Sequence, residues 1–130
     1  MFVAKFLGTP PINVFRGTVK NNELYIGDEK IMDVNVPDID VYVGIRPEGC
    51  IYAPENGVLT CKLLAVEVMG RDSSIVSTHA DAESVNIRSI IDSDVVVDKE
   101  IGYAKFRIKP NKIFLFRQDT EERIYLGNEE

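Results

Sequence analysis

The sequence predicts a small all-β domain, a barrel or sandwich of short antiparallel strands. Three observations support this prediction. β-branched and aromatic residues gather in short runs, turn-forming residues separate these runs about every ten residues, and no long helical period competes with them. With 130 residues and 45% hydrophobic content, the chain has the size and apolar share of one compact domain.

Eight runs are expected to be strands, because each is rich in residues that suit a pleated, half-buried surface. The expected strands are 14–19, 24–26, 41–45, 58–68, 75–78, 85–90, 103–108 and 113–116. Turn-forming residues lie between them: Asn21-Asn22, Gly27-Asp28, Glu55-Asn56-Gly57, Lys109-Pro110-Asn111 and Gln118-Asp119. The helix candidate is the opening segment 2–7, which Gly8 and two prolines would end.

Run 103–108 shows clear alternation between polar and apolar residues, which predicts a strand with one wet and one dry face. The wet face would carry Tyr103, Lys105 and Arg107, and the dry face Ala104, Phe106 and Ile108.

Residues 43–48 (VGIRPE) and 106–111 (FRIKPN) echo each other. Each is an apolar stretch that ends in isoleucine, a basic residue, proline and a polar residue. Because proline has no N–H to donate to a sheet, each strand is expected to stop and turn there. Two copies leave both duplication and coincidence open.

Charge and composition exclude several partners. The net charge of -6 predicts a well-solvated surface that repels polyanions, so no nucleic-acid partner is expected. No apolar run approaches the roughly 18 residues that cross a bilayer, so no direct membrane insertion is expected. Cys50 and Cys61 lack C-x-x-C spacing and are interpreted as reduced, structural thiols of a cytosolic protein.

No catalytic, cofactor-binding or metal-binding residue is predicted in this chain. It has no G-x-x-x-x-G-K-[ST] loop, so it should not bind ATP, and one histidine excludes a two-histidine metal site. Ser74, His79 and Asp81 lie too close along one strand to converge easily as a hydrolase triad.

Two pairs of acids, Asp38 with Asp40 and Asp92 with Asp94, are interpreted as solvated loop residues because neither lies in a calcium-binding loop. The segment 70–74 is either a plain hairpin turn or an anion-binding nest of backbone amides, and the plain turn is favoured.

Four segments, read together, resemble the region that follows the ATPase core in the maltose and multiple-sugar importer ATPases. Residues 2–13 (FVAKFLGTPPIN) resemble the family's exit from the nucleotide-binding domain, and residues 44–48 match its "GIRPE" motif. Residues 66–72 resemble its "VE-x-x-G-x-(E/D)" turn, and residues 114–124 its terminal "HLFD-x-x-TGERI". The sequence departs from this pattern at Phe114, Gln118 and Glu121, in an edge turn.

The resemblance implies a carboxy-terminal accessory domain, the transport-associated oligonucleotide-binding-like (OB-like) domain. Residues 1–16 would be the tail of a nucleotide-binding domain and 17–130 the OB-like barrel. ATP and Mg would bind in the preceding domain, so the parent would be an ATPase and this chain would have no activity of its own. Phe2 begins inside a family motif, which implies that Met1 is not a natural amino terminus.

The resemblance also implies partners: the chain's own nucleotide-binding domain, a second copy of the subunit and membrane permease subunits. The parent would be cytoplasmic and peripheral to the membrane. The expected function is regulation and dimerisation, and its rival is a small-ligand barrel that binds an oxyanion or a sugar. An oligonucleotide-binding barrel shares the architecture, but the acidic balance disfavours it.

Interface or structural roles are expected for eight residues. In the opening segment, apolar side chains would pack against the missing domain; in "GIRPE", the residues would either end a strand or transmit regulation; in the 66–72 turn, they would shape the hairpin. These candidates are Phe2, Phe6, Leu7, Arg46, Pro47, Glu48, Gly70 and Asp72.

Overall fold

The computed structural model describes residues 12–83 and 86–124, and these fold entirely into strands, turns and two short 3₁₀ helices. The strands are β1 (Asn13–Lys20), β2 (Glu23–Ile26), β3 (Glu29–Asp33), β4 (Ile39–Ile45), β5 (Cys50–Tyr52), β6 (Leu59–Met69), β7 (Asp72–Thr78), β8 (Ile87–Asp92), β9 (Tyr103–Ile108), β10 (Ile113–Arg117) and β11 (Arg123–Ile124). The 3₁₀ helices are η1 (Pro47–Gly49) and η2 (Pro110–Lys112). The expected helix in segment 2–7 lies outside the described residues.

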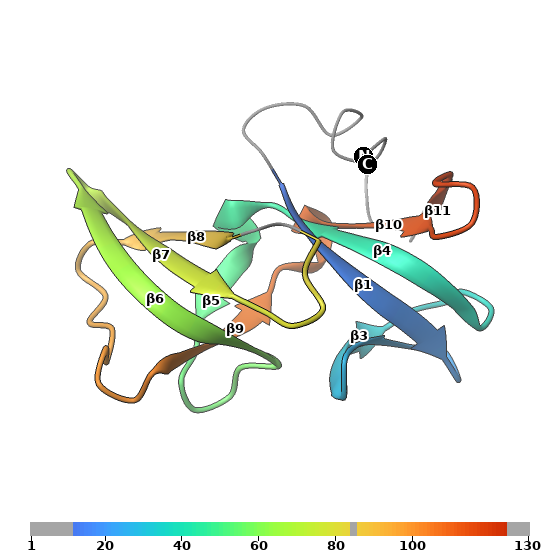
Figure 1. Ribbon diagram of the computed structural model, residues 1–130, viewed down its shortest axis with the longest axis horizontal. Helices are drawn as coiled ribbons and strands as arrows, with labels where there is room; N and C mark the ends of the chain where they lie inside the picture. Colours follow the sequence, from blue (N-terminus) through green and yellow to red (C-terminus); the bar gives the residue numbers. More distant parts are fainter. Residues whose placement is uncertain (1–11, 84–85, 125–130) are drawn as a thin grey trace.

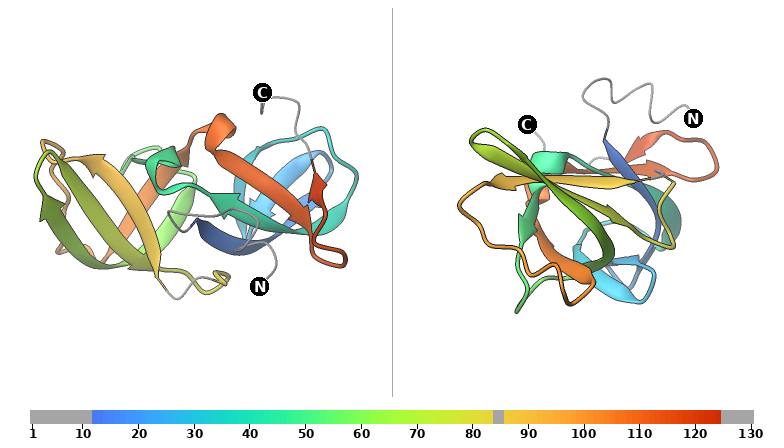
Figure 2. Two further views of the ribbon diagram at one scale, coloured as in Figure 1. Left: turned by 90° about the horizontal axis from the view of Figure 1, so that it is seen from above. Right: turned by 60° about the vertical axis from the view of Figure 1, so that its left-hand side comes forward.

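Two antiparallel sheets lie side by side (Figure 1). One has six strands in the order β11-β10-β4-β1-β2-β3, and the other has five in the order β5-β9-β6-β7-β8. The five-stranded sheet curls into a nearly closed barrel, which Figure 2 shows from two further directions. The predicted all-β barrel is therefore confirmed, and a second sheet accompanies it.

Each of the eight expected strands coincides with an observed strand, within the described residues. Strands β3, β5 and β11 were not expected. β3 carries charged residues at three of its five positions, and β5 and β11 have only three and two residues, so none shows a strong apolar alternation. The predicted faces of β9 are confirmed, since Ala104 and Phe106 are buried while Tyr103 and Arg107 are exposed.

One continuous hydrophobic core joins the inner faces of both sheets. It includes Phe15 and Leu115 from the six-stranded sheet and Ile75, Leu59 and Phe106 from the five-stranded one, and all five are fully buried. Burying each such side chain contributes roughly 1.5 to 3 kcal/mol. The sheets therefore share one core and form a single structural unit.

The two echoed sequence stretches occupy equivalent places where the chain crosses between the sheets. One passes from β4 through η1 to β5, and the other from β9 through η2 to β10. β4 pairs with β10, and β5 pairs with β9. At one end of the crossing Ile45 is opposite Ile113, and at the other Cys50 is opposite Ile108. The two stretches thus run antiparallel across the junction.

Backbone hydrogen bonds at this crossing are reciprocal. Gly49 N–H donates to the carbonyl of Arg46 (2.8 Å), and Lys112 N–H donates in the same way to Lys109 (3.0 Å). Between the stretches, Arg46 N–H donates to Lys112 (3.1 Å) and Lys109 N–H donates to Gly49 (2.9 Å). Each proline occupies the first position of its 3₁₀ helix, where no intrahelical donor is needed. The two similar sequence stretches therefore form the same local structure, a strand end followed by a proline-led 3₁₀ turn.

Gly49 is required by the closeness of this crossing. A Cβ atom at position 49 would lie 2.5 Å from the Cβ of Lys112 and 3.2 Å from its Cγ. These two residues hold equivalent places in the two stretches, so only one of them can carry a side chain there.

A second connection between the sheets involves the first half of β1. Arg16 N–H donates to the carbonyl of Asp81 (2.7 Å), and Glu83 N–H donates to that of Val14 (2.7 Å). The segment that leads from β7 to β8 thus continues the six-stranded sheet beside β1, on the side where the short β2 does not reach. The guanidinium of Arg16 also pairs with the carboxylate of Glu83.

Asn13 completes this connection with its side chain. Its Nδ2 donates to the carbonyl of Arg88 (2.8 Å), and its Oδ1 accepts from Arg88 N–H (2.9 Å). The amide therefore bonds to β8 as one more strand residue would, and it is only 3% exposed. The predicted domain boundary between residues 16 and 17 falls inside β1 and stays a prediction.

Gly49→Ala is expected to lower the free energy of unfolding by about 1 to 3 kcal/mol, because overpacking at a tight contact has this effect. In the double variant Gly49→Ala, Lys112→Gly, the side chain opposite position 49 is absent. Its loss of unfolding free energy should therefore be smaller than the sum of the losses in the two single variants. Urea unfolding of the four chains measures this coupling. Strict additivity would contradict a steric origin.

Asn13→Ala is expected to reduce the free energy of unfolding by about 2 kcal/mol, because it removes the partner of two part-buried backbone groups, the N–H and the carbonyl of Arg88. The matched control is Asn111→Ala, an exposed asparagine in η2, which should stay within about 0.5 kcal/mol of the natural chain. Chemical unfolding compares the two. Equal effects at both positions would mean that the Asn13 amide adds nothing.

Candidate functional site

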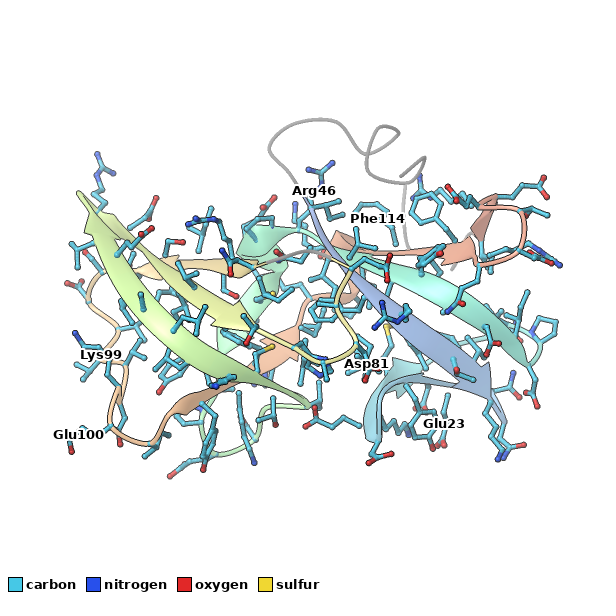
Figure 3. The ribbon with its side chains drawn as sticks, viewed as in Figure 1. Glu23, Arg46, Asp81, Lys99, Glu100 and Phe114 are labelled. Atoms are coloured by element: carbon cyan, nitrogen blue, oxygen red, sulfur yellow. The ribbon has the colours of Figure 1, made fainter. Side chains whose placement is uncertain are left out.

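The "GIRPE" candidates lie together at the crossing between the sheets. Arg46 is extended, with φ -69° and ψ 145°, and Pro47 begins η1 and is buried. The guanidinium carbon of Arg46 lies over the ring of Phe114 in β10, 5.6 Å from its centroid, and Figure 3 shows the two side chains close together. The strand end that the sequence predicted at Pro47 is therefore present, and Arg46 projects from it onto an aromatic ring.

A second arginine, Arg123 of β11, also contacts the ring of Phe114. The guanidinium carbon of Arg123 lies 4.9 Å from the ring centroid, so two cations contact one ring. Each contact of this kind contributes about 0.5 to 1 kcal/mol when exposed, and more when desolvated. The stack holds Arg46 in a defined orientation beside the crossing. Residues 12–83 and 86–124 provide no hydrogen-bond partner for its guanidinium.

Glu48 lies on the other side of the same turn. Its carboxylate is 3.9 Å from the Nζ of Lys112, and both side chains are more than one third exposed. An exposed pair at this distance contributes little to stability. Glu48 and Arg46 thus have different neighbours at the crossing, a lysine and an aromatic ring.

An apolar cluster adjoins Phe114 on the face of the six-stranded sheet that turns away from the main core. Along β10, Ile113 and Leu115 enter the main core, whereas Phe114 and Phe116 belong to this second cluster. We call it the outer cluster; its members are Ile12, Val14, Tyr42, Phe114 and Phe116. The outer cluster is thus a small second core beside the contact of Arg46 with Phe114, with Ile12, Val14 and Phe116 buried.

Gly70 and Asp72 lie elsewhere. They flank the tip of the β6–β7 hairpin, far from η1 in Figure 1. Gly70 has φ +69°, a conformation that L side chains rarely adopt, and Asp72 is exposed. The structure does not bring these two residues together with Arg46 and Glu48. Phe2, Phe6 and Leu7 lie outside the described residues.

The hairpin tip has the geometry of the plain turn. Met69 pairs with Asp72 across a two-residue loop, and Ser73 and Ser74 are each only 3% exposed within β7. The segment is therefore a two-residue hairpin loop that leads directly into β7.

The contacts of His79 are those of a residue that stabilises the fold. Its Nδ1 accepts a hydrogen bond from Asp81 N–H (3.0 Å), and its ring packs edge-on against Phe15, with centroids 5.5 Å apart. The Nδ1 atom therefore accepts a backbone hydrogen bond, whereas in a catalytic imidazole oriented by a carboxylate it would donate to that carboxylate.

The paired acids also have local partners. Asp38 accepts from Asn21 N–H (2.9 Å), and Asp40 accepts from the hydroxyl of Thr18 (3.1 Å). Asp92 accepts from Asp94 N–H (3.1 Å), which closes a turn after β8. In the part of the chain that the structure describes, no three His, Cys, Asp or Glu side chains converge as metal ligands would.

Both cysteines are free and lie inside the five-stranded barrel, each only 2% exposed. Burial raises the pKa of Cys50 to about 11 and that of Cys61 to about 12, from an ordinary value of about 9. The thiols are therefore protonated and shielded near neutral pH.

Sequence reasoning missed two contributors to this arrangement. Phe114 was noted as a departure from the family pattern, and nothing in one sequence indicates that two arginines would meet at its ring. Asn13 closes the opening motif, but its role depends on a residue 75 positions away.

Comparisons with known proteins identify relatives along almost the whole chain. An ABC transporter ATP-binding protein of Mycoplasma genitalium is 30% identical over 127 residues, which make up 95% of this chain and 21% of that protein. A sn-glycerol-3-phosphate import ATP-binding protein of a Jannaschia species is 28% identical over 126 residues, 95% of this chain and 34% of that protein. The relatives that match 95% of this chain are thus carboxy-terminal parts of ABC ATP-binding subunits, which fits an accessory domain of that type.

A third relative of the accessory domain is a xylose/arabinose import ATP-binding protein of Haloferax volcanii, 28% identical over 143 aligned positions, covering 96% of this chain and 37% of that protein. The chain thus spans between about one fifth and about two fifths of the length of these curated relatives. No known protein-family profile matches it. The described residues contain no helix with the length and apolar character of a membrane span.

The buried thiols make a pH-dependent contribution to the stability of the accessory domain. Because the folded-state pKa values are raised, thiolates form first in the unfolded chain, and this contribution is complete below about pH 9. It should fall as the pH rises through about 11 and 12. The difference in urea midpoint between the natural chain and the double variant Cys50→Ala, Cys61→Ala should therefore shift above pH 9. A difference that stays constant with pH would contradict burial of the thiols.

Proposed function

We propose that this accessory domain is a regulatory and dimerisation module of the ATP-binding subunit of an ABC importer, with no reaction of its own. The observation that carries the proposal is the similarity of 95% of the chain to proteins named as ABC transporter or import ATP-binding proteins. The chain matches only a minor part of each relative and has no phosphate-binding loop. ATP and Mg would accordingly bind in a nucleotide-binding domain outside this chain.

The import substrate is proposed to be a sugar or a related polyol derivative. Relatives are named for import of sn-glycerol-3-phosphate and of xylose and arabinose, which favours this class. The corresponding location is the cytoplasmic face of the membrane, where the subunit would dock on permease subunits.

The surface at the crossing is proposed as the contact through which the domain communicates with its nucleotide-binding domain or with a second copy of the subunit. Two properties support this choice. Arg46 is held by Phe114, and the described residues provide no hydrogen-bond partner for its guanidinium, so it could bind a carboxylate with little loss of conformational freedom. The crossing also joins both sheets, so a displacement of the backbone there would affect the core that the sheets share.

Arg46→Ala, in the assembled ATP-binding subunit that contains this domain, is expected to weaken dimerisation or to change the ATPase rate coupled to transport by several-fold. Arg46→Lys keeps the charge but loses the planar fork and should restore only part of the effect. Sedimentation and transport-coupled ATPase assays measure the two quantities. The control is Arg71→Ala at the exposed hairpin tip.

Unfolding of the isolated chain separates a structural from a functional role. Removing the cation–π contact should cost only about 0.5 to 1 kcal/mol. Unchanged dimerisation and unchanged coupled ATPase in Arg46→Ala would refute the role of the crossing surface.

A further inference from the structure

The outer face of β6 and β9 carries an unusual set of side chains for an acidic protein. Lys62 is opposite Tyr103, and Lys105 lies two residues further along the same face of β9, followed by Arg107. Leu64 lies at a break in the β6–β7 register and is 52% exposed. We call this surface the basic face; it consists of Lys62, Leu64, Tyr103, Lys105 and Arg107.

The cations of the basic face lack acidic partners within the described residues. Ion pairs elsewhere in that part of the chain involve Arg16, Lys30, Arg88, Lys112 and Arg117. Lys62, Lys105 and Arg107 form none, although the whole chain has a net charge of -6. Directly across the sheet these cations face Tyr103, Thr60 and Ile51, none of which is acidic.

Two acids border this face. Glu29 of β3 accepts hydrogen bonds from Thr60 N–H (2.9 Å) and from the Thr60 hydroxyl (2.7 Å), which occupies both of its oxygens. Glu55 lies in the turn before β6 and forms no ion pair within residues 12–83 and 86–124. Glu29 thus keeps its negative charge next to Thr60, and within the described residues neither acid forms an ion pair with the three cations.

Apolar groups at the end of the face make it suitable for a protein partner. Leu63 N–H donates to the carbonyl of Gly102 (3.1 Å), which holds the middle of β6 beside the start of β9. Around this bond, Leu64, Ile101 and Tyr103 are 52%, 42% and 43% exposed. Tyrosine is enriched at protein interfaces, and Lys62 is opposite Tyr103, so this end of the face combines exposed apolar groups with a cation.

We propose that the basic face binds an acidic, amphipathic segment of another protein, with carboxylates on Lys62, Lys105 and Arg107 and apolar side chains on Leu64 and Tyr103. This site is distinct from the crossing surface and does not depend on the proposed function. Nucleic acid fits less well, because three cations in a protein of net charge -6 neutralise few phosphates and leave the apolar groups unused.

The test titrates the 130-residue chain, labelled with ¹⁵N, with a short synthetic peptide of glutamate, leucine and phenylalanine. Amide shifts should change around Lys62, Tyr103 and Arg107, and affinity should fall when NaCl is raised from about 0.05 to about 0.5 M. The triple variant Lys62→Glu, Lys105→Glu, Arg107→Glu should bind at least about tenfold more weakly.

A matched triple variant controls for net charge. Lys20→Glu, Arg71→Glu and Lys99→Glu change the charge by the same amount at exposed positions elsewhere and should leave affinity within about twofold. Leu64→Ser alone should weaken binding without lowering the unfolding midpoint, because the side chain is half exposed.

Four results would overturn the proposal. The first is an absence of peptide binding, and the second is an equal loss of affinity in both triple variants. The third is equal or tighter binding of single-stranded DNA or of phosphatidylserine vesicles with the same dependence on the basic face. The fourth is self-association of the chain through this face, detected by sedimentation.

Discussion

The fold depends on the place where two stretches of chain cross between the sheets. At that place each backbone donates to the other, and each turns through a proline-led 3₁₀ helix. Because β4 and β10 enter one sheet while β5 and β9 enter the other, these bonds fix the relative position of both sheets. The shared core can then form from their inner faces, with Phe15 on one side and Phe106 on the other.

Alternation and turn chemistry predict most of this fold because they are local properties. β9 shows this directly, since the exposure of its side chains follows the sequence. The pairing of strands into two sheets is different, because it depends on contacts such as Asn13 with Arg88, which no local pattern encodes. The echo of "IRPE" and "IKPN" marked both turns, but sequence alone could not show that they are neighbours.

The candidate site was only partly predictable for the same reason. Arg46, Pro47 and Glu48 are adjacent in sequence and act together, whereas Gly70 and Asp72 occupy the opposite end of the barrel. A motif places residues on one strand, but only the fold decides which other strand faces them. The aromatic ring under Arg46 comes from β10, some seventy residues later in the chain.

The amide of Asn13 has a consequence for behaviour at high concentration. β8 is the last strand of its sheet, and such a strand presents unpaired backbone groups on which another chain can extend the sheet. Asn13 occupies the N–H and carbonyl of Arg88 near the start of this edge. One side chain therefore blocks intermolecular strand addition there, so the residue protects solubility as well as joining the two sheets.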